Sequence, residues 1–249
     1  MKRFFSAFGE FVVFTLLVVR RMFSRGYTFR ALKQQMHRIG VESLTVVNLC
    51  AFFIGLVMVV QTQSMLKRFG AQTSVSMVVT ASFVREIGPV FAAIMFAGRI
   101  GTGIAAELGS MVVTEQIDAY RVFGADPIAR LAVPRILATT LMLPALTVIA
   151  NVVGIFAGFL IVVFELGEPG VLYLKGAMGV LTRLDVVSCL VKGVVFGLTI
   201  GLIASNIGFR TERATEAVGT STTKTMVQAV LAILIVDLII TKTILLVGS

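Results

Sequence analysis

Five long apolar stretches with few charges divide this 249-residue sequence. They cover residues 42–65, 73–106, 131–164, 185–208 and 225–248. A helix needs about 20 apolar residues to cross the hydrocarbon of a bilayer, and each stretch is at least that long. Only 14% of the residues are charged, against about 25% in soluble domains, which makes a soluble enzyme a poor fit. We therefore expect an all-α integral membrane protein with five transmembrane helices.

The first 40 residues contain a shorter apolar segment with basic residues at both ends. This segment, residues 11–19, has nine residues, which are too few to span a membrane, so residues 1–23 are predicted to form an amphipathic helix in the interface. Residues 24–40 predict a short surface helix. A cleaved signal peptide is the alternative, but no small-x-small cleavage site follows. We accordingly divide the chain into interfacial helices, 1–40, and a transmembrane domain, 41–249.

Lysine and arginine are distributed unevenly among the connections. With the N-terminus inside, the inner segments carry 14 of the 22 basic residues, the outer connections carry four, and four lie within the spans. Cytoplasmic loops of membrane proteins carry the excess of Lys and Arg. The count predicts a cytoplasmic N-terminus.

Two charged residues stand near the middle of the second apolar stretch. Arg85 and Glu86 precede Pro89, which has no N–H and clashes with the carbonyl four residues earlier, so a kink or break is expected there. A charge inside a span must be paired or reach water. The pair could line a polar cavity and meet an anionic headgroup or a gating partner. It could instead form a structural ion pair with another span, for example through Lys192.

A polar segment, residues 107–130, separates the second and third spans. Thr114 could cap a short helix over Glu115–Phe123 that ends at Gly124. Such a helix would be amphipathic, and an amphipathic helix beside a membrane can dock into the groove of a cytosolic partner. It can equally rest on lipid as a simple connector. The spacing alone does not separate these two hypotheses.

Small residues recur every four positions in the fourth span. Gly193, Gly197 and Gly201 allow close helix packing, either within one subunit or between two.

The sequence offers no motif for catalysis, metal binding or nucleotide binding. Cys50 and Cys189 stand in apolar runs and are expected to be buried rather than disulfide-bonded. No phosphate-binding loop, Rossmann glycine motif or metal-ligand cluster is present, so energy for transport would come from another chain or an ion gradient.

Several motifs together resemble one family of membrane proteins, the MlaE/YrbE family. They are Arg85-Glu86-Ile87-Gly88-Pro89, Gly98-Arg99-Ile100-Gly101, Ala106-Glu107-Leu108-Gly109 and Thr114-Glu115-Gln116-Ile117-Asp118-Ala119, followed by Asp126-Pro127 and Pro134-Arg135. Members are permease subunits of ABC transporters that move phospholipids in Gram-negative envelopes. Residues 208–219 depart from the glycine-rich later loop of that family.

The resemblance implies a function, partners and site residues. It implies a homodimer with a phospholipid pocket at its interface, two cytoplasmic ATPase subunits that use ATP and magnesium, a periplasmic ring of MCE-domain proteins, and a role in outer-membrane lipid asymmetry. The chain itself would sit in the bacterial inner membrane, hold no cofactor or metal, catalyse no reaction and bind no nucleic acid. The implied lipid-binding or gating residues are Arg85, Glu86, Leu49, Phe52, Phe53 and Leu56. The implied ATPase-coupling residues are Glu115, Gln116, Ile117, Asp118, Tyr120 and Arg121.

Two other functions remain as alternatives. A proton-coupled secondary transporter of lipids or amphiphiles would use Glu86 as its carrier, and it predicts inverted repeats, which the sequence does not display convincingly. A lipid-modifying phosphotransferase would need clustered Asp residues for metal-assisted chemistry, whereas the four Asp of this chain are scattered.

Overall fold

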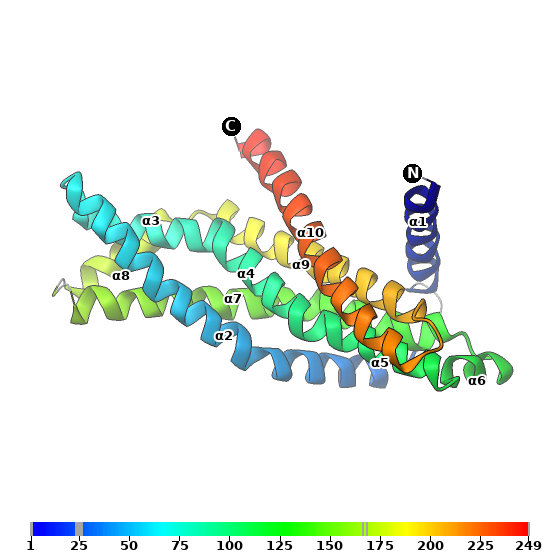
Figure 1. The fold of residues 1–249 in the computed structure, drawn as a ribbon. Helices are drawn as coiled ribbons and strands as arrows, with labels where there is room; N and C mark the ends of the chain where they lie inside the picture. The colour runs from blue at the N-terminus through cyan, green and yellow to red at the C-terminus, as the bar shows by residue number, and fades with distance from the viewer. Residues whose placement is uncertain (1, 23–26, 166, 168, 249) are drawn as a thin grey trace.

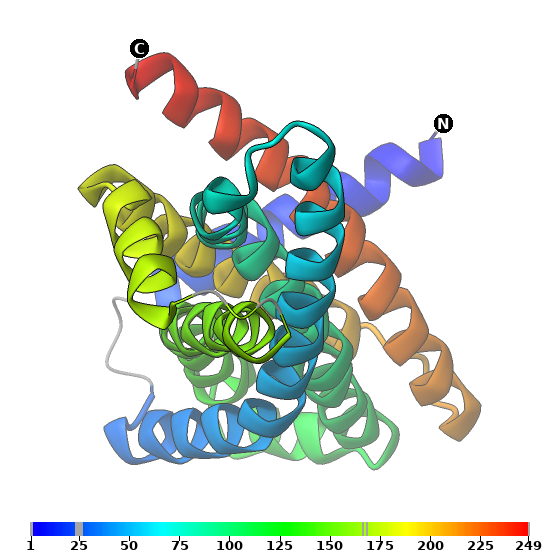
Figure 2. The same ribbon diagram turned by 90° about the vertical axis from the view of Figure 1, so that its left-hand side faces the viewer.

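The computed structural model of the protein describes residues 2–22, 27–165, 167 and 169–248, and these form helices joined by short connections (Figures 1 and 2). Five helical segments are long and apolar enough to cross a membrane: Phe29–Arg68, Val75–Val113, Ile128–Phe164, Arg183–Phe209 and Thr215–Ile244. The expected all-α membrane fold with five apolar spans is thereby confirmed.

The helices follow in chain order from α1 to α10. Their bounds are α1 Lys2–Met22, α2 Phe29–Arg68, α3 Val75–Ser82, α4 Gly88–Phe96, α5 Thr102–Val113, α6 Gln116–Val122, α7 Val133–Phe164, α8 Gly170–Val180, α9 Arg183–Phe209 and α10 Thr215–Gly248. A 3-10 turn, Gln72–Ser74, precedes α3, and π-helical turns occupy Phe83–Ile87, Ala97–Gly101 and Ile128–Ala132. The second span is therefore α3, α4 and α5 joined by two π-helical turns.

Helix α1 lies across the end of the bundle, as an interfacial helix would (Figure 1). Phe14 and Val18 on its inner face are buried against Val133 and Ile136. Helix α2 differs from expectation, because residues 29–40 form its first turns rather than a separate surface helix. Thr28 starts α2 by accepting a hydrogen bond from the backbone N–H of Ala31. The division at residues 40 and 41, which falls inside α2, stays a prediction.

The break expected before Pro89 is present. The N–H of Gly88 bonds to the carbonyl of Phe83, five residues earlier, instead of the usual four. A π-helical turn of this kind re-aims the side chains within it, and such turns occur frequently at functional sites. Here it contains Arg85 and Glu86.

Glycines bring three of the spans into close contact. An ideal Cβ on Gly55 of α2 would lie 2.1 Å from the carbonyl oxygen of Gly154 in α7. On α9, an added Cβ at Gly193 or Gly197 would lie within 3.0 Å of the α7 backbone. These contacts support the expectation of packing within one subunit. Bare backbones that approach this closely gain dispersion contacts that lipid cannot supply.

We predict that Gly55→Ala destabilises the protein, because the new methyl group must push α2 away from the backbone of α7. Overpacking costs about 1–3 kcal/mol, so the apparent melting temperature in detergent should fall by roughly 2–10 °C. The matched control is Gly103→Ala in α5, where an added Cβ meets nothing within 4 Å. Equal melting temperatures for the two variants would contradict the packing described here.

Candidate functional site

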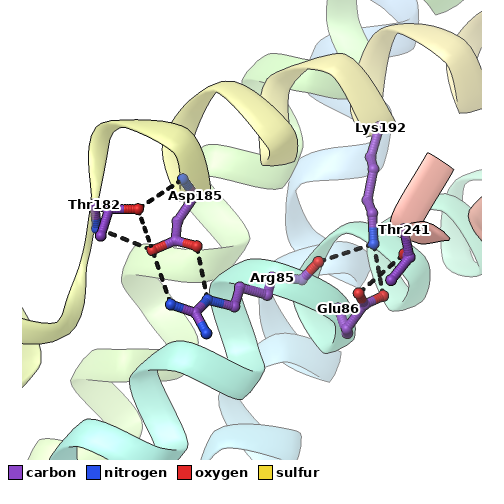
Figure 3. Close-up of polar contacts among 6 residues, drawn as sticks. All are labelled: Arg85, Glu86, Thr182, Asp185, Lys192 and Thr241. Atoms are coloured by element: carbon purple, nitrogen blue, oxygen red, sulfur yellow. Dashed lines mark hydrogen bonds and ion pairs between the residues drawn. The ribbon is translucent and has the colours of Figure 1, made fainter. Parts of the chain in front are cut away.

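Arg85 and Glu86 leave the π-helical turn Phe83–Ile87 in different directions and make two sets of polar contacts (Figure 3). Arg85 extends to the first turn of α9. Glu86 points toward Lys192, further along α9, and toward Thr241 of α10. Arg85 and Glu86, adjacent in the sequence, thus connect the second span to the fourth and fifth spans.

The Arg85 guanidinium makes a two-pronged contact with Asp185. Its Nε donates to Oδ1 at 2.7 Å and one terminal nitrogen donates to Oδ2 at 3.2 Å. Oδ2 also accepts from the backbone N–H and the hydroxyl of Thr182, at 2.9 and 2.8 Å, which completes a capping box at the start of α9. Asp185 therefore stabilises the helix terminus and holds Arg85 at once.

Lys192 is buried, with 1% of its side chain exposed, and its ammonium contacts three oxygens. It donates to Glu86 Oε2 at 2.6 Å and to the backbone carbonyl of Arg85 at 2.9 Å. That carbonyl is the one that Pro89, four residues later, cannot serve, so the proline break and the lysine fit together. Asp237 Oδ1 lies 2.8 Å from Nζ, within ion-pair distance but without an accepted hydrogen bond. Thr241 donates to Glu86 Oε1 at 3.0 Å.

Exposure differs sharply across this charged cluster, which we define as Arg85, Glu86, Asp185, Lys192 and Asp237. The side chains of Arg85 and Glu86 are 49% and 43% exposed, whereas that of Lys192 is closed off. Sequence reasoning named Lys192 as a partner but missed Asp185, Asp237 and Thr241. The sequence held a signal for two of them, because Asp185 begins the fourth apolar stretch and Asp237 lies inside the fifth.

The four apolar residues expected at the lipid pocket all lie on α2. Leu49 and Phe53 are exposed, while Phe52 and Leu56 are partly buried, and the Phe52 and Phe53 rings meet edge to face. Gly55, between them in sequence, faces α7 instead. From Leu49 to Val60, the outward side of α2 is thus apolar.

Helix α6 lies at the same end of the bundle as α1 (Figure 1). It begins after Glu115, whose φ of 59° is left-handed, and Gly124 follows its end with φ of 70°. The expected cap by Thr114 is wrong, because that hydroxyl donates to the carbonyl of Ser110 in the preceding helix, at 2.8 Å. The side-chain amide of Gln116 in turn donates to Thr114.

The expected coupling residues divide into buried and exposed ones. Ile117 is buried and Tyr120 packs partly buried against the same core cluster, so these two hold α6 to the bundle. Asp118 pairs with Arg121 at 3.0 Å and with Arg213, before α10, at 2.6 Å. Arg213 also lies 3.5 Å from Glu115. The most exposed apolar side chains here were not among the expected site residues: Val122 at 84% and Phe123 at 86%.

We predict that Lys192→Met destabilises the protein much more than Arg85→Met. Removing the buried ammonium leaves two carboxylates unpaired and should cost about 3–5 kcal/mol. Removing the half-exposed guanidinium should cost about 1 kcal/mol or less, because Thr182 still satisfies Asp185. Unfolding by denaturant in mixed micelles measures both. Adding Glu86→Gln and Asp237→Asn to Lys192→Met should recover much of the lost unfolding free energy, because no carboxylate is then left unpaired. Equal losses for Lys192→Met and Arg85→Met would contradict this prediction.

The sequence was compared with known families and proteins. The family model described as Permease MlaE matches residues 32–243. A probable ABC transporter permease protein of Rickettsia typhi is 35% identical, over 96% of this chain and 93% of that protein. The intermembrane phospholipid transport system permease protein MlaE of Haemophilus influenzae is 34% identical, over 96% and 92%. The chloroplast protein TRIGALACTOSYLDIACYLGLYCEROL 1 of Arabidopsis thaliana is 36% identical, over 90% and 64%. The chain belongs to the MlaE permease family.

Proposed function

We propose that this chain is the non-catalytic membrane subunit of an ATP-driven phospholipid transporter that maintains outer-membrane lipid asymmetry. The observation that carries the proposal is a pair of half-exposed charges, Arg85 and Glu86, inside a membrane-spanning segment. Such charges are costly against hydrocarbon, so they call for a polar cavity. An apolar cleft with a charged wall suits a substrate that has acyl chains and an anionic headgroup. The name of the Haemophilus relative, an intermembrane phospholipid transport system permease protein, agrees with this substrate class.

The cavity would form between two copies of the chain. Leu49 and Phe53 on α2 and Leu234 and Leu238 on α10 are exposed, and they provide the apolar surface for such a contact. In its most apolar stretch, α10 is only 11% buried within one chain. A second copy would cover these faces and close the cleft around the half-exposed pair. Arg85 would then attract the headgroup or gate its passage.

The energy would arrive through α6. Buried Ile117 anchors this helix to the bundle, while the exposed pair Val122 and Phe123 offers an apolar tip to a cytoplasmic ATPase. The excess of basic residues near the α1 and α6 end supports a cytoplasmic position for that end, and with it a cytoplasmic N-terminus. ATP and magnesium would be bound by the partner. The chain would lie in the bacterial inner membrane, and its opposite end would face a periplasmic ring of MCE-domain proteins.

We predict that Phe123→Asp weakens association with the ATPase without unfolding the chain. Losing an apolar anchor at an interface costs about 2 kcal/mol or more, roughly a 30-fold weaker complex. The measurement is co-purification of the ATPase from detergent, with nucleotide-driven lipid transfer as a second readout. Phe69→Asp is the matched control, because Phe69 is 74% exposed and follows α2 at the opposite end of the bundle. If both variants retain the ATPase equally, α6 is not the docking element.

A second prediction concerns the charge of Arg85. Arg85→Glu should impair phospholipid transfer while the assembled complex still forms, because the reversed charge repels an anionic headgroup. Arg85→Gln controls for stability, since it removes the charge while Thr182 still holds Asp185 in its capping box. We expect Arg85→Gln to keep a melting temperature close to that of wild type and to transfer phospholipid more slowly. Unchanged transfer by Arg85→Glu would make Arg85 a structural residue.

A further inference from the structure

A groove runs between α2 and α7 on the outside of the bundle, apart from the charged cluster. Its volume is about 330 Å³. Met36, Val41 and Leu44 line it from α2, and Met142, Ala145 and Ile149 line it from α7. The two helices are in contact here, because an ideal Cβ on Gly40 of α2 would lie 2.6 Å from the terminal methyl group of Met142 in α7. Both belong to membrane-spanning segments, so an outward groove on them faces lipid.

Two polar side chains occupy one end of the groove. Lys33 and His37 are exposed on the same face of α2, one turn apart, toward the end of the bundle where α1 lies. Neither has an ion-pair or hydrogen-bond partner among the residues that the structure describes. The carboxylate of Glu42, further along α2, is already taken by Arg38 at 3.3 Å. A cation and an N–H donor are therefore free beside an apolar channel.

The groove is long enough for part of an acyl chain. From Lys33 to Leu44 the helix rises about 16 Å. The apolar stretch of α2 begins at residue 42, so Lys33 and His37 lie on its headgroup side. An acyl chain can therefore run along the groove from the level of Lys33 and His37 into the apolar part of α2. Its phosphate would then stand level with the ammonium group and the imidazole.

We propose that this groove binds one anionic phospholipid of the leaflet on the α1 side, as a resident lipid rather than transported cargo. One acyl chain lies between α2 and α7, and the headgroup is held by Lys33 and His37. The lipid fills a surface that α2 and α7 leave open and connects the two helices. The inference is independent of the proposed transport function, because it uses none of the charged cluster or of α6.

The test is native mass spectrometry of the full chain, titrated in detergent with phosphatidylglycerol or phosphatidylcholine. Wild type should bind phosphatidylglycerol more tightly. Lys33→Gln with His37→Gln should weaken phosphatidylglycerol binding at least about fivefold, the value of one cation at an anionic headgroup. The control Lys67→Gln with Arg68→Gln removes exposed cations from the other end of α2 and should leave binding unchanged. Equal binding of the two lipids, or equal effects of the two double variants, would overturn the headgroup assignment.

A second pair of variants tests the groove itself. Ala145 is exposed and lines the groove, so Ala145→Phe fills it without disturbing the core and should remove one tightly bound phosphatidylglycerol. Val148→Phe adds the same ring to an exposed position of α7 outside the groove lining and should remove none. Identical lipid counts for both variants would overturn the proposal. So would a disulfide between two copies of a Val41→Cys variant, because a second chain would then occupy the groove.

Discussion

A charge placed in hydrocarbon must find a partner, and this constraint determines how the spans pack around the π-helical turn Phe83–Ile87. Lys192 is buried inside a spanning helix, where an unpaired ammonium would cost at least about 2.5–3.5 kcal/mol. Its three oxygen partners come from the second and fifth spans. The proline that breaks the second span leaves the carbonyl of Arg85 without its usual donor, and the lysine takes that place. The backbone defect and the buried charge therefore stabilise one another.

Two contacts at the ends of α10 connect the proposed ATPase-docking helix, α6, with the charged cluster. Arg213, just before α10, pairs with Asp118 of α6, and Thr241, near the other end of α10, bonds to Glu86. Helix α10 is continuous between these contacts and lightly packed in its most apolar stretch. Under the proposed function, a displacement of α6 by an ATPase would reach the charged cluster along a single helix. The exposed ion pairs at α6 are individually weak, which suits contacts that must exchange during a transport cycle.

Local sequence rules predicted the number of spans, the break before Pro89 and the close packing at the glycines, because each depends on a few adjacent residues. They did not predict that Asp185 pairs with Arg85 or that Asp237 pairs with Lys192, since each of these contacts connects side chains on two different spans. The change from polar to apolar sequence near residue 40 suggested a helix boundary, yet helical hydrogen bonds continue through it. In α6 both faces contain apolar residues, so only tertiary packing separates buried Ile117 from exposed Val122.

The central claim is that this chain moves phospholipid only when a separate ATPase drives it. The most direct measurement is the transfer of a fluorescent phospholipid across proteoliposomes that contain the chain with and without its co-purifying ATPase. The account predicts ATP-dependent transfer in the complex and background transfer for the chain alone, whether or not a pH gradient is imposed. Rapid transfer by the chain alone, above all one driven by a proton gradient, would contradict it and favour a secondary transporter.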